Sequence, residues 1–507
     1  MKKTILLAFA LLSFVGAVAQ NNNAPSKYTP TAQNLAAREA FQDQKFGVFL
    51  HWGLYSMIGE SEWVMTNRNI NYKEYPKLAQ TFYPSNFNAD EWVAAIKAAG
   101  AKYVTITTRH HDGFSLYKTA TSTYNSVDGS PFKRDIIKEM ADACARQGIK
   151  LHLYYSHLDW YRTDYPVGRT GKGTGRPKDA ANWKSYYNFM NTQLTELLTN
   201  YGPVGAIWFD GWWDHDSDPT PFDWELPQQY AMIHKLQPQC LIANNHHQVP
   251  FAGEDIQIFE RDLPGENKAG LSGQSISHLP LESCQTINEH WGYSLVDSNY
   301  KSGKELIQML VRAAGKNANL LLNVGPEPGG ELPSLAVARL KEIGQWLSKY
   351  GNTIYGTRGG LVAPHHWGVS TQRGNKLYIH ILDLQEAGLY LPLGKRMPKS
   401  ATEFATGKRV NFTKHADGIT LHLDKVPTDI DYVVELTMQT HHLSAATHQY
   451  KAPCTRTTRL LYLRYKHLVV SVQAFCRDTT RCLVLISACA LRQATAFLTF
   501  IFFTMTR

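Results

Sequence analysis

Short apolar runs alternate with polar clusters and amphipathic stretches along most of the chain. Each run is nearly continuous and rich in Val, Ile, Leu and aromatic residues, as in parallel strands buried on both faces. Eight runs fit this description: Phe46–Trp52, Tyr103–Thr108, Lys150–Ser156, Ala206–Asp210, Cys240–Asn245, Ile256–Glu260, Cys284–Ile287 and Leu320–Val324. Helical spacing lies between several of them, at Ala89–Ala99, Ile136–Gln147, Trp183–Asn200, Lys304–Ala314 and Leu335–Ser348. Repeated strand-helix units over about 300 residues predict an α/β fold, a (β/α)8 TIM-like barrel.

The pattern changes after Tyr350 to short runs in which apolar and polar residues alternate. These runs are Lys376–Leu384, Gly388–Pro392, Thr420–Leu423 and Asp431–Thr437, and no long helical stretch separates them. Such a pattern predicts a small antiparallel β domain. We therefore expect a catalytic barrel over residues 20–355 and a β domain over residues 356–438.

The first residues have the layout of a secretory signal peptide. Two lysines follow Met1, an apolar stretch runs from Thr4 to Val18, and small residues precede Gln20. The stretch is shorter than the roughly 20 residues that a membrane-spanning helix needs. The sequence thus predicts a signal peptide at residues 1–19 and an exported protein, whether periplasmic, surface-associated or extracellular.

The composition of residues 439–507 differs from that of the rest of the chain. Residues 441–507 hold nine Lys and Arg against one acidic residue, so they carry eight of the nine net positive charges. They contain no glycine and four of the seven cysteines. We predict that this basic tail is a non-native extension or disordered. Without the tail the chain is nearly neutral, so its net charge gives no reason to expect a nucleic-acid partner. The other cysteines, Cys144, Cys240 and Cys284, show no metal-ligand spacing.

Hydrogen-bonding and aromatic residues follow six of the predicted strands, at the end where a barrel enzyme carries its active site. They form the segments His51-Trp52-Gly53, Arg109-His110-His111-Asp112-Gly113, Tyr154-Tyr155-Ser156-His157, Trp208-Phe209-Asp210-Gly211-Trp212-Trp213, Asn244-Asn245-His246-His247 and Phe259-Glu260-Arg261-Asp262. One such histidine or tryptophan is usually a core residue, but six strand ends of this kind predict a site. Aromatic rings beside carboxylates suit a sugar, which presents apolar faces and hydroxyl groups.

Asp210 is the most informative position of this rim. It ends an apolar run and precedes a glycine, although burying an unpaired carboxylate costs several kcal/mol. Retaining glycoside hydrolysis needs such a nucleophile and a second carboxyl roughly 5 Å away as general acid and base. We expect Glu260 to be that partner, with Glu266 and Glu282 as weaker candidates.

Taken together, six motifs resemble those of the α-L-fucosidases of glycoside hydrolase family 29. They are Phe46-Gly-Val-Phe-Leu-His-Trp-Gly-Leu-Tyr-Ser, Glu62-Trp63, Arg109-His-His-Asp-Gly-Phe, Ile207-Trp-Phe-Asp-Gly, Trp291-Gly-Tyr and Leu321-Leu-Asn-Val-Gly-Pro. The resemblance spans roughly residues 28–438. It implies a barrel followed by a β-sandwich, retention of configuration, and a covalent fucosyl intermediate on Asp210.

The same resemblance implies a substrate and the residues that bind it. The substrate is terminal α-L-fucose on a glycan or glycoconjugate, and no metal or cofactor takes part. Fucose-binding roles fall on His51, His110, His111 and Tyr155, with Glu62, Trp63, Trp208 and Trp291 near the pocket. The general acid/base stays open among Glu260, Glu266 and Glu282, because the loop after the sixth strand varies among such enzymes. Relatives often have a tryptophan before the glutamate where this chain has Leu281-Glu282, so Glu260 ranks ahead of Glu282.

Two other functions remain as alternatives. A metal-dependent barrel hydrolase would use the histidines as ligands, but His110 and His111 on one extended strand would face opposite ways. A fucose-binding lectin would use the same pocket without turnover, although both expected carboxyl groups are present. The sequence leaves the linkage, the natural glycan and the oligomeric state open.

Overall fold

The computed structural model describes residues 28–439 in full, and beyond them the strands at 459–465, 468–478 and 481–490. Their contacts divide the chain into one compact unit that ends at Gln439 and a second that starts at Thr440. The predicted signal peptide, residues 1–19, lies outside the described residues.

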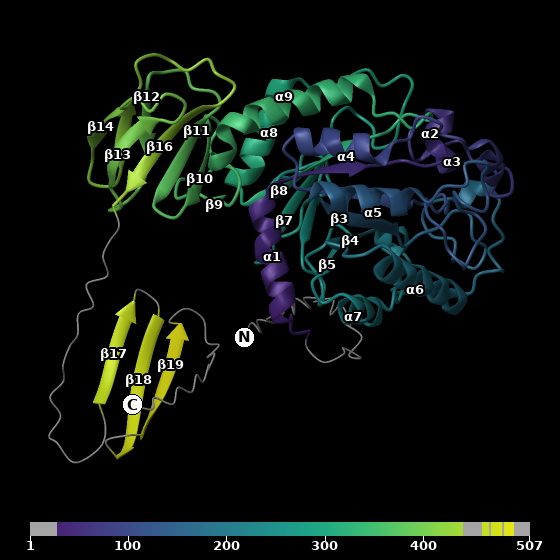
Figure 1. The fold of residues 1–507 in the computed structure, drawn as a ribbon, viewed down its shortest axis with the longest axis horizontal. Coiled ribbons are helices and arrows are strands. Elements are labelled where there is room, and N and C mark those ends of the chain that lie inside the picture. Colours follow the sequence, from purple (N-terminus) through teal and green to yellow (C-terminus); the bar gives the residue numbers. More distant parts are fainter. Residues whose placement is uncertain (1–27, 440–458, 466–467, 479–480, 491–507) are drawn as a thin grey trace, which may run out of the picture. The chain divides into compact units, whose positions relative to one another are not determined.

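Eight parallel strands form the core of the first unit (Figure 1). They are β1 (Phe46–Leu50), β2 (Tyr103–Arg109), β3 (Lys150–Ser156), β4 (Ala206–Asp210), β5 (Leu241–Asn245), β6 (Gln257–Glu260), β7 (Leu281–Thr286) and β8 (Ala318–Val324). Neighbours in the chain pair with one another, and β1 also pairs with β8. A parallel bridge from Ala243 to Ile256 joins β5 to the chain just before β6. The strands therefore close into the predicted barrel.

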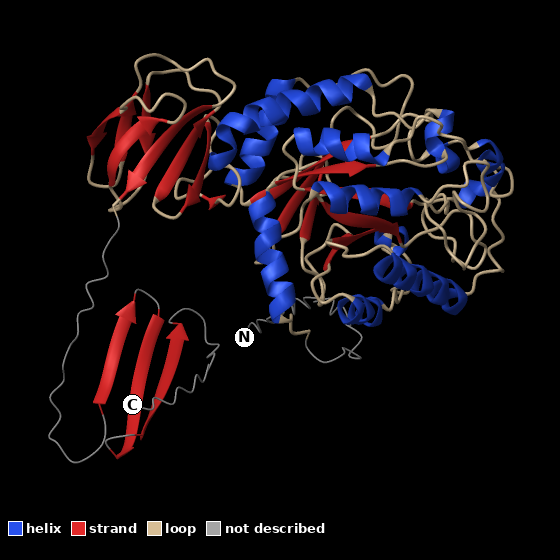
Figure 2. Cartoon of the chain, in the orientation of Figure 1, coloured by secondary structure: helices blue, strands red, loops and turns tan. Residues whose placement is uncertain are grey.

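Helices surround this barrel (Figure 2). The α-helices of the unit are α1 (Ala32–Gln44), α2 (Tyr55–Ile58), α3 (Val64–Asn67), α4 (Ala89–Ala98), α5 (Ile136–Gln147), α6 (Trp183–Asn200), α7 (Leu226–Leu236), α8 (Gly303–Gly315) and α9 (Ser334–Tyr350). Short 3-10 helices lie at η1 (Tyr75–Thr81), η2 (Lys172–Thr174), η3 (Trp212–His215) and η4 (Gly351–Thr353). Within residues 28–439 no helix connects β5 to β6 or β6 to β7, and long loops take that place.

Helix α1 is not among the helices that the sequence pattern predicts. Thr31 caps its first turn by accepting a hydrogen bond from the backbone of Asn34. Phe41 packs against Tyr103 and His152 and belongs to the apolar cluster inside the barrel. Because only Asn34 and Phe41 of this helix are buried, its sequence shows almost no apolar face. The hydrophobic periodicity of this segment was therefore too weak to predict the helix.

The β domain consists of two antiparallel sheets that share one apolar core. One sheet has the order β13-β16-β11-β10-β9 and the other β12-β15-β14. Their strands are β9 (Arg358–Gly359), β10 (Gly368–Arg373), β11 (Lys376–Ile381), β12 (Gly388–Leu391), β13 (Pro398–Glu403), β14 (Asn411–Lys414), β15 (Ile419–His422) and β16 (Tyr432–Met438). Residues of both sheets, such as Leu377 and Leu421, are buried together. This is the expected sandwich.

The sandwich packs on helix α8 of the barrel. Gln308 donates hydrogen bonds to the carbonyls of Leu382 and Ile430. A side chain at Gly315 would lie 2.4 Å from Val369 Cβ, so a glycine is needed there for the close approach. The predicted boundary at residue 355 falls between α9 and β9.

The second unit contains a separate antiparallel sheet of β17 (Arg459–Tyr465), β18 (Leu468–Asp478) and β19 (Arg481–Ala490). The expectation that the basic tail is disordered stays a prediction. The other expectation, a non-native origin, also stays a prediction.

Candidate active site

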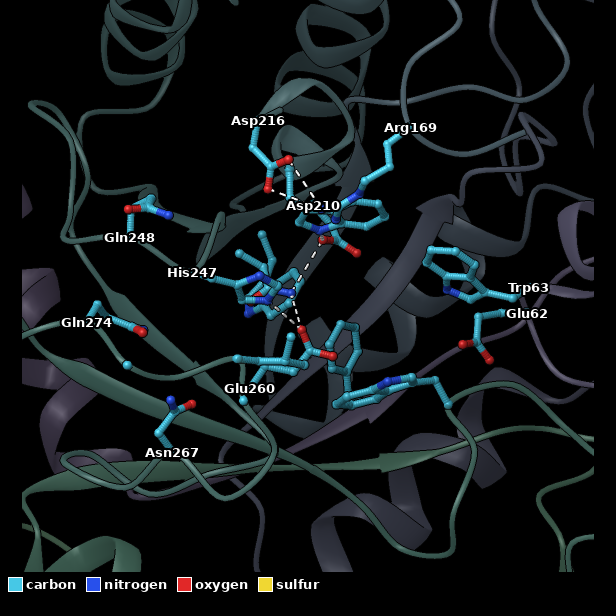
Figure 3. A pocket seen from close by; sticks show the side chains of 18 of the residues that line it. Glu62, Trp63, Arg169, Asp210, Asp216, His247, Gln248, Glu260, Asn267 and Gln274 are labelled. Atoms are coloured by element: carbon cyan, nitrogen blue, oxygen red, sulfur yellow. Dashed lines mark hydrogen bonds and ion pairs between the residues drawn. The ribbon is translucent and has the colours of Figure 1, made fainter. Parts of the chain in front are cut away.

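A cavity of about 770 Å³ opens at the carboxyl ends of the barrel strands. Figure 3 shows Asp210 and Glu260 in its middle, Glu62 and Trp63 on one side, and Gln248, Asn267 and Gln274 on the other. We call these the inner half and the outer half of the cavity. The inner half is lined by Phe49, His51, Glu62, Trp63, His110, Trp208, Trp213 and Trp291, and the outer half by Gln248, Val249, Asn267, Gly270, Leu271, Gly273, Gln274 and Ser275. Arg169, which lies over the ring of Trp213, and its partner Asp216 border both halves.

Asp210 is the last residue of β4, and its two carboxylate oxygens have different surroundings. Oδ1 accepts hydrogen bonds from the backbone of Gly211 (2.8 Å), from Trp213 Nε1 (3.0 Å) and from Asn245 Nδ2 (3.4 Å). Oδ2 accepts one hydrogen bond, from the hydroxyl of Tyr154 at 3.0 Å. Gly211 has φ +93, so the chain can turn sharply and bring its amide back to the carboxylate. Oδ1 is thus held in place and Oδ2 is the more available oxygen.

The surroundings of Asp210 raise the pKa of its carboxyl group toward neutral pH. Burial and the nearby charge of Glu260 raise its pKa to about 6, against the hydrogen bonds from Trp213 and Tyr154. The pocket therefore contains a carboxyl group that is ionised at neutral pH and protonated in mild acid.

Glu260 ends β6 and shares a hydrogen-bond donor with Asp210. Asn245 Nδ2 lies 2.8 Å from Glu260 Oε2 and 3.4 Å from Asp210 Oδ1, so these two oxygens are at most about 6 Å apart. His247 Nε2 lies 2.8 Å from the same Oε2 atom. Two carboxyl groups at this spacing, in one cavity, can act on the two sides of one bond.

Glu260 and His247 shift each other's protonation. Burial alone would raise the pKa of Glu260, but the hydrogen bond and charge of His247 outweigh it and lower the pKa. Burial alone would lower the pKa of His247, but the hydrogen bond and charge of Glu260 raise it. The two groups form an ion pair that holds one proton between them.

Three buried histidines face the inner half in their neutral form. Burial lowers the pKa of His51 to about 4 and lowers the pKa of His110 and of His111 well below the ordinary value. His51 Nδ1 donates to Asn323 Oδ1 at 2.7 Å, which leaves its other nitrogen as an acceptor. Neutral imidazoles of this kind can accept hydrogen bonds from sugar hydroxyls.

Aromatic rings form the walls around these histidines. Trp208 and Trp291 pack edge to face on Phe49. Trp63 stacks on Trp213, with ring centroids 5.6 Å apart and planes inclined by 17°. The carboxylate of Glu62 is fixed by the backbone amide of Gly292 at 2.7 Å and by Ser61. An aromatic, water-poor wall with a few fixed polar groups suits one sugar ring.

The outer half has no aromatic residue among the residues that line it. Its polar side chains are mainly the carboxamides of Gln248, Asn267 and Gln274. The ion pair of Arg169 Nη1 and Asp216 Oδ1, 3.2 Å apart, lies beside Trp213 at the border of the two halves. Gln274 donates to the carbonyl of Ile258 at 2.8 Å, while its Oε1 is buried and has no partner among the described residues. This half therefore offers hydrogen bonds without a strong net charge.

Of the ten site residues predicted from the sequence, eight line the cavity: Asp210, Glu260, His51, Glu62, Trp63, His110, Trp208 and Trp291. His111 borders it, because its Nε2 lies 3.6 Å from Asp210 Oδ2. Tyr155 does not line the cavity, which differs from the binding role expected for it. Its hydroxyl donates to Gln193 of α6 and its ring lies under Arg109, outside the barrel wall. Side chains alternate along a strand, so the neighbouring Tyr154 is the one that reaches Asp210.

The two weaker candidates for the acid/base lie away from the cavity. Glu266 pairs with Lys268 and Lys316. Glu282 lies within β7 because that strand starts at Leu281, three residues before the predicted run. Its carboxyl is fully buried and accepts hydrogen bonds from Tyr103 and from Trp208.

Four residues whose side chains hydrogen-bond the carboxyl pair were not predicted as site residues: Tyr154, Trp213, Asn245 and His247. Tyr154 and Asn245 pair in register with Trp208 and Asp210, so strand alternation applied across β3, β4 and β5 would have found them. His247 lies beyond the end of β5, in a loop that periodicity does not describe. Only its proximity to Glu260 in space identifies it.

The argument against a metal site rested partly on the direction of two histidines. His110 and His111 both follow β2, which ends at Arg109, and their ring centroids are 4.1 Å apart. The expectation that they face opposite ways is wrong, because neither lies in the extended strand. Among the described residues no group of three or more His, Cys, Asp or Glu side chains could hold a metal ion.

None of the described helices is long and apolar enough to span a bilayer.

Comparisons with known proteins agree with this geometry. The family model described as alpha-L-fucosidase matches residues 15–352. A putative alpha-L-fucosidase of Caenorhabditis elegans is 30% identical over 366 residues, which cover 65% of this chain and 70% of the relative. Plasma alpha-L-fucosidase of Rattus norvegicus is 28% identical over 440 residues, covering 79% and 90%.

Solved structures give the same result. Alpha-L-fucosidase isoenzyme 1 from Paenibacillus thiaminolyticus superposes with a TM-score of 0.71 at 35% identity, covering 80% of this chain and all of that one. A GH29 alpha-L-fucosidase from Bacteroides thetaiotaomicron, trapped as a covalent intermediate in a Glu-to-Gln variant, superposes at 0.70 with 26% identity, covering 82% and 98%. The sequence match over most of the barrel and these structures show that the chain belongs to the α-L-fucosidase family of glycoside hydrolases.

Proposed function

We propose that the protein releases terminal α-L-fucose from glycans or glycoconjugates with retention of configuration, with Asp210 as nucleophile and Glu260 as general acid and base. One observation carries the proposal. Asn245 Nδ2 hydrogen-bonds both carboxyl groups, which limits their nearest oxygens to about 6 Å. Retaining enzymes have carboxyl groups about 5 to 5.5 Å apart, whereas inverting enzymes leave room for a water molecule.

The first half of the reaction forms the intermediate. Asp210 Oδ2 attacks the anomeric carbon, and the bond from this carbon to the glycosidic oxygen breaks. Glu260 gives its proton to that oxygen, so the leaving group departs as an alcohol. Oδ2 suits this role because Oδ1 already accepts three hydrogen bonds.

The second half hydrolyses the intermediate. Glu260, now a carboxylate, takes a proton from water while the water oxygen bonds to the anomeric carbon. The ester bond to Asp210 breaks and its electron pair returns to the carboxylate. The relative from Bacteroides thetaiotaomicron, in which a Glu-to-Gln variant trapped a covalent intermediate, supports this division of roles.

Azide rescue tests both assignments. From an α-fucoside, Asp210→Ala with azide should give β-fucosyl azide, because azide replaces the nucleophile in one displacement. Glu260→Ala should give α-fucosyl azide, because azide attacks the intermediate in a second displacement. Loss of activity in Glu282→Ala, with Glu260→Ala unaffected, would contradict the assignment of the acid/base.

We also propose that the protein is exported, on the basis of the signal-peptide pattern at residues 1–19. N-terminal sequencing of the protein secreted by its own host tests this. A mature chain that starts near Gln20 is expected, and an uncleaved Met1 in the cytoplasm would contradict it.

A further inference from the structure

Two hydrogen-bond donors converge on one oxygen of Glu260. Asn245 Nδ2 and His247 Nε2 each lie 2.8 Å from Oε2. Oε1 accepts no hydrogen bond from any described residue, although the carboxyl group lines the cavity. The second oxygen is therefore the one that is free to meet the glycosidic oxygen of a substrate.

His247 is placed for this contact by an unusual backbone. Its φ is +62, a left-handed conformation that is uncommon for a residue with a side chain and that often marks a functional constraint. The preceding residue, His246, is fastened to Glu254 by contacts of 3.0 Å. The strained turn separates the two rings, so one anchors the loop and the other faces Glu260.

We propose that His247 is the positioning residue of the general acid/base: its Nε2–H fixes Glu260 through Oε2, leaves Oε1 for the glycosidic oxygen, and gives the pair a second place to hold the catalytic proton. The inference rests on the proposed function. It adds to that function a residue outside the two carboxyl groups and a defined proton balance between His247 and Glu260.

The surrounding charges support this proton sharing. Glu260 faces His247, Asn245, Arg261 and Asp210, and the more distant His51 and Cys284 also interact with its charge. His247 faces Glu260 and Asp210, with Arg169 opposing. Together they lower the pKa of Glu260 and raise that of His247, so the last proton leaves the pair at the raised pKa of the histidine.

The pair contributes to both chemical steps. When Glu260 Oε1 gives its proton to the leaving oxygen, the new carboxylate keeps the hydrogen bond from His247, which makes Glu260 a stronger acid. When the same carboxylate takes a proton from water, the pair returns to its starting proton count. His247 itself touches neither the broken nor the formed bond.

Two variants separate positioning from proton storage. His247→Gln keeps an N–H donor but cannot take up a proton, whereas His247→Leu removes both properties. His234→Gln is the matched control, because His234 pairs with Asp255 at 2.9 Å, a similar contact outside the cavity. We would measure kcat/KM from pH 4 to 9 on 4-nitrophenyl and phenyl α-L-fucosides, which differ in how much acid assistance the leaving group needs.

With His247→Leu, we expect kcat/KM on phenyl fucoside to fall on the order of 10- to 100-fold more than on 4-nitrophenyl fucoside, because acid catalysis is weakened. With His247→Gln, most of the phenyl fucoside activity should return. Its alkaline limb should move to lower pH, on the order of one to two units, because only the carboxyl then holds the proton. The control should keep the wild-type profile.

Equal losses on the two substrates for His247→Leu, or a wild-type alkaline limb for His247→Gln, would overturn the inference. Failure of the proposed function is distinguishable from these outcomes. In that case wild-type protein gives no turnover with either fucoside, or Asp210→Ala gives no β-fucosyl azide. Thermal melting of each variant shows whether it folds.

Discussion

The two halves of the cavity differ in how the fold builds them. The inner half comes mainly from strand ends and buried rings: Phe49 lies in β1 and Trp208 in β4, and His51 and His110 follow β1 and β2 directly. The outer half comes mainly from the loops that follow β5 and β6, where no helix intervenes within residues 28–439. The carboxyl pair lies between them (Figure 3). One half is thus fixed by the barrel, and the other is set by loop sequence.

This difference assigns different tasks to the two halves. Fixed aromatic walls and neutral histidines suit the sugar that every substrate shares. Loops with carboxamide groups suit the part of the substrate that varies, because loops tolerate sequence change better than strands. Variants of the carboxyl pair or of the inner half should therefore lower activity on all substrates. Variants of the outer half should lower activity only on substrates whose leaving group contacts its loops.

Replacement of the nucleophile should have the largest effect. Asp210→Asn keeps the shape of the side chain and an oxygen for the donors of Gly211 and Trp213, but it cannot form the ester. We expect kcat to fall on the order of 10⁴-fold or more on every fucoside, as when other enzymes lose their nucleophile. Steady-state kinetics with two leaving groups measures it. A variant that keeps a tenth of the wild-type rate would remove Asp210 from this role.

Loss of an inner-half histidine should come next. His51→Ala removes a buried acceptor and leaves Asn323 Oδ1 without its 2.7 Å donor. A sugar hydroxyl that donates to His51 would lose its acceptor, which costs about 1 to 3 kcal/mol, so kcat/KM should fall roughly 10- to 100-fold. The loss should be equal for aryl and sugar leaving groups. A loss confined to one leaving group would show that the inner half does not bind the shared sugar.

The acid limb of the pH profile should reflect the carboxyl that lies between the halves. Burial and the charge of Glu260 raise the pKa of Asp210 to about 6. The nucleophile must be ionised, so kcat/KM should fall tenfold for each unit below about pH 6, and the limb should be the same for both leaving groups. Rates measured from pH 4 to 7 test this. A limb near pH 4 would mean that Asp210 titrates as an ordinary aspartate.

Buried Glu282, which accepts a hydrogen bond from Trp208 of the inner half, should make the stability of the protein depend on pH. Burial raises its pKa to about 7, against the hydrogen bonds from Tyr103 and Trp208. Between pH 4.5 and 7 the folded protein keeps this proton while the unfolded chain loses it, so stability falls by about 1 kcal/mol per pH unit. Glu282→Gln removes this dependence. Its melting temperature, relative to wild type, should therefore rise from pH 5 to pH 8, and a constant difference would contradict the raised pKa.

The sequence predicted the strand-built half of the site better than the loop-built half. Apolar runs placed Asp210 and Trp208 at a strand end, and register extends this to Tyr154. Periodicity carries no information about where a loop residue such as His247 or Gln274 points. The error at Tyr155 has another cause, since a motif match fixed the segment but not which of two adjacent tyrosines faces inward. Helix α1 was missed because its buried face is only two residues wide.

The smallest effect is expected in the outer half and would be specific to the leaving group. Gln274 lines the outer half of the cavity, where its carboxamide can hydrogen-bond a hydroxyl of the leaving group. Gln274→Ala should lower kcat/KM about 3- to 10-fold on the disaccharide that the enzyme cleaves best, the value of one neutral hydrogen bond. The rate on 4-nitrophenyl fucoside, which lacks that hydroxyl, should change less. Gln385→Ala, an exposed glutamine of the sandwich, is the control. Equal losses on both substrates would mean that the loops support the whole cavity and that its two halves do not act separately.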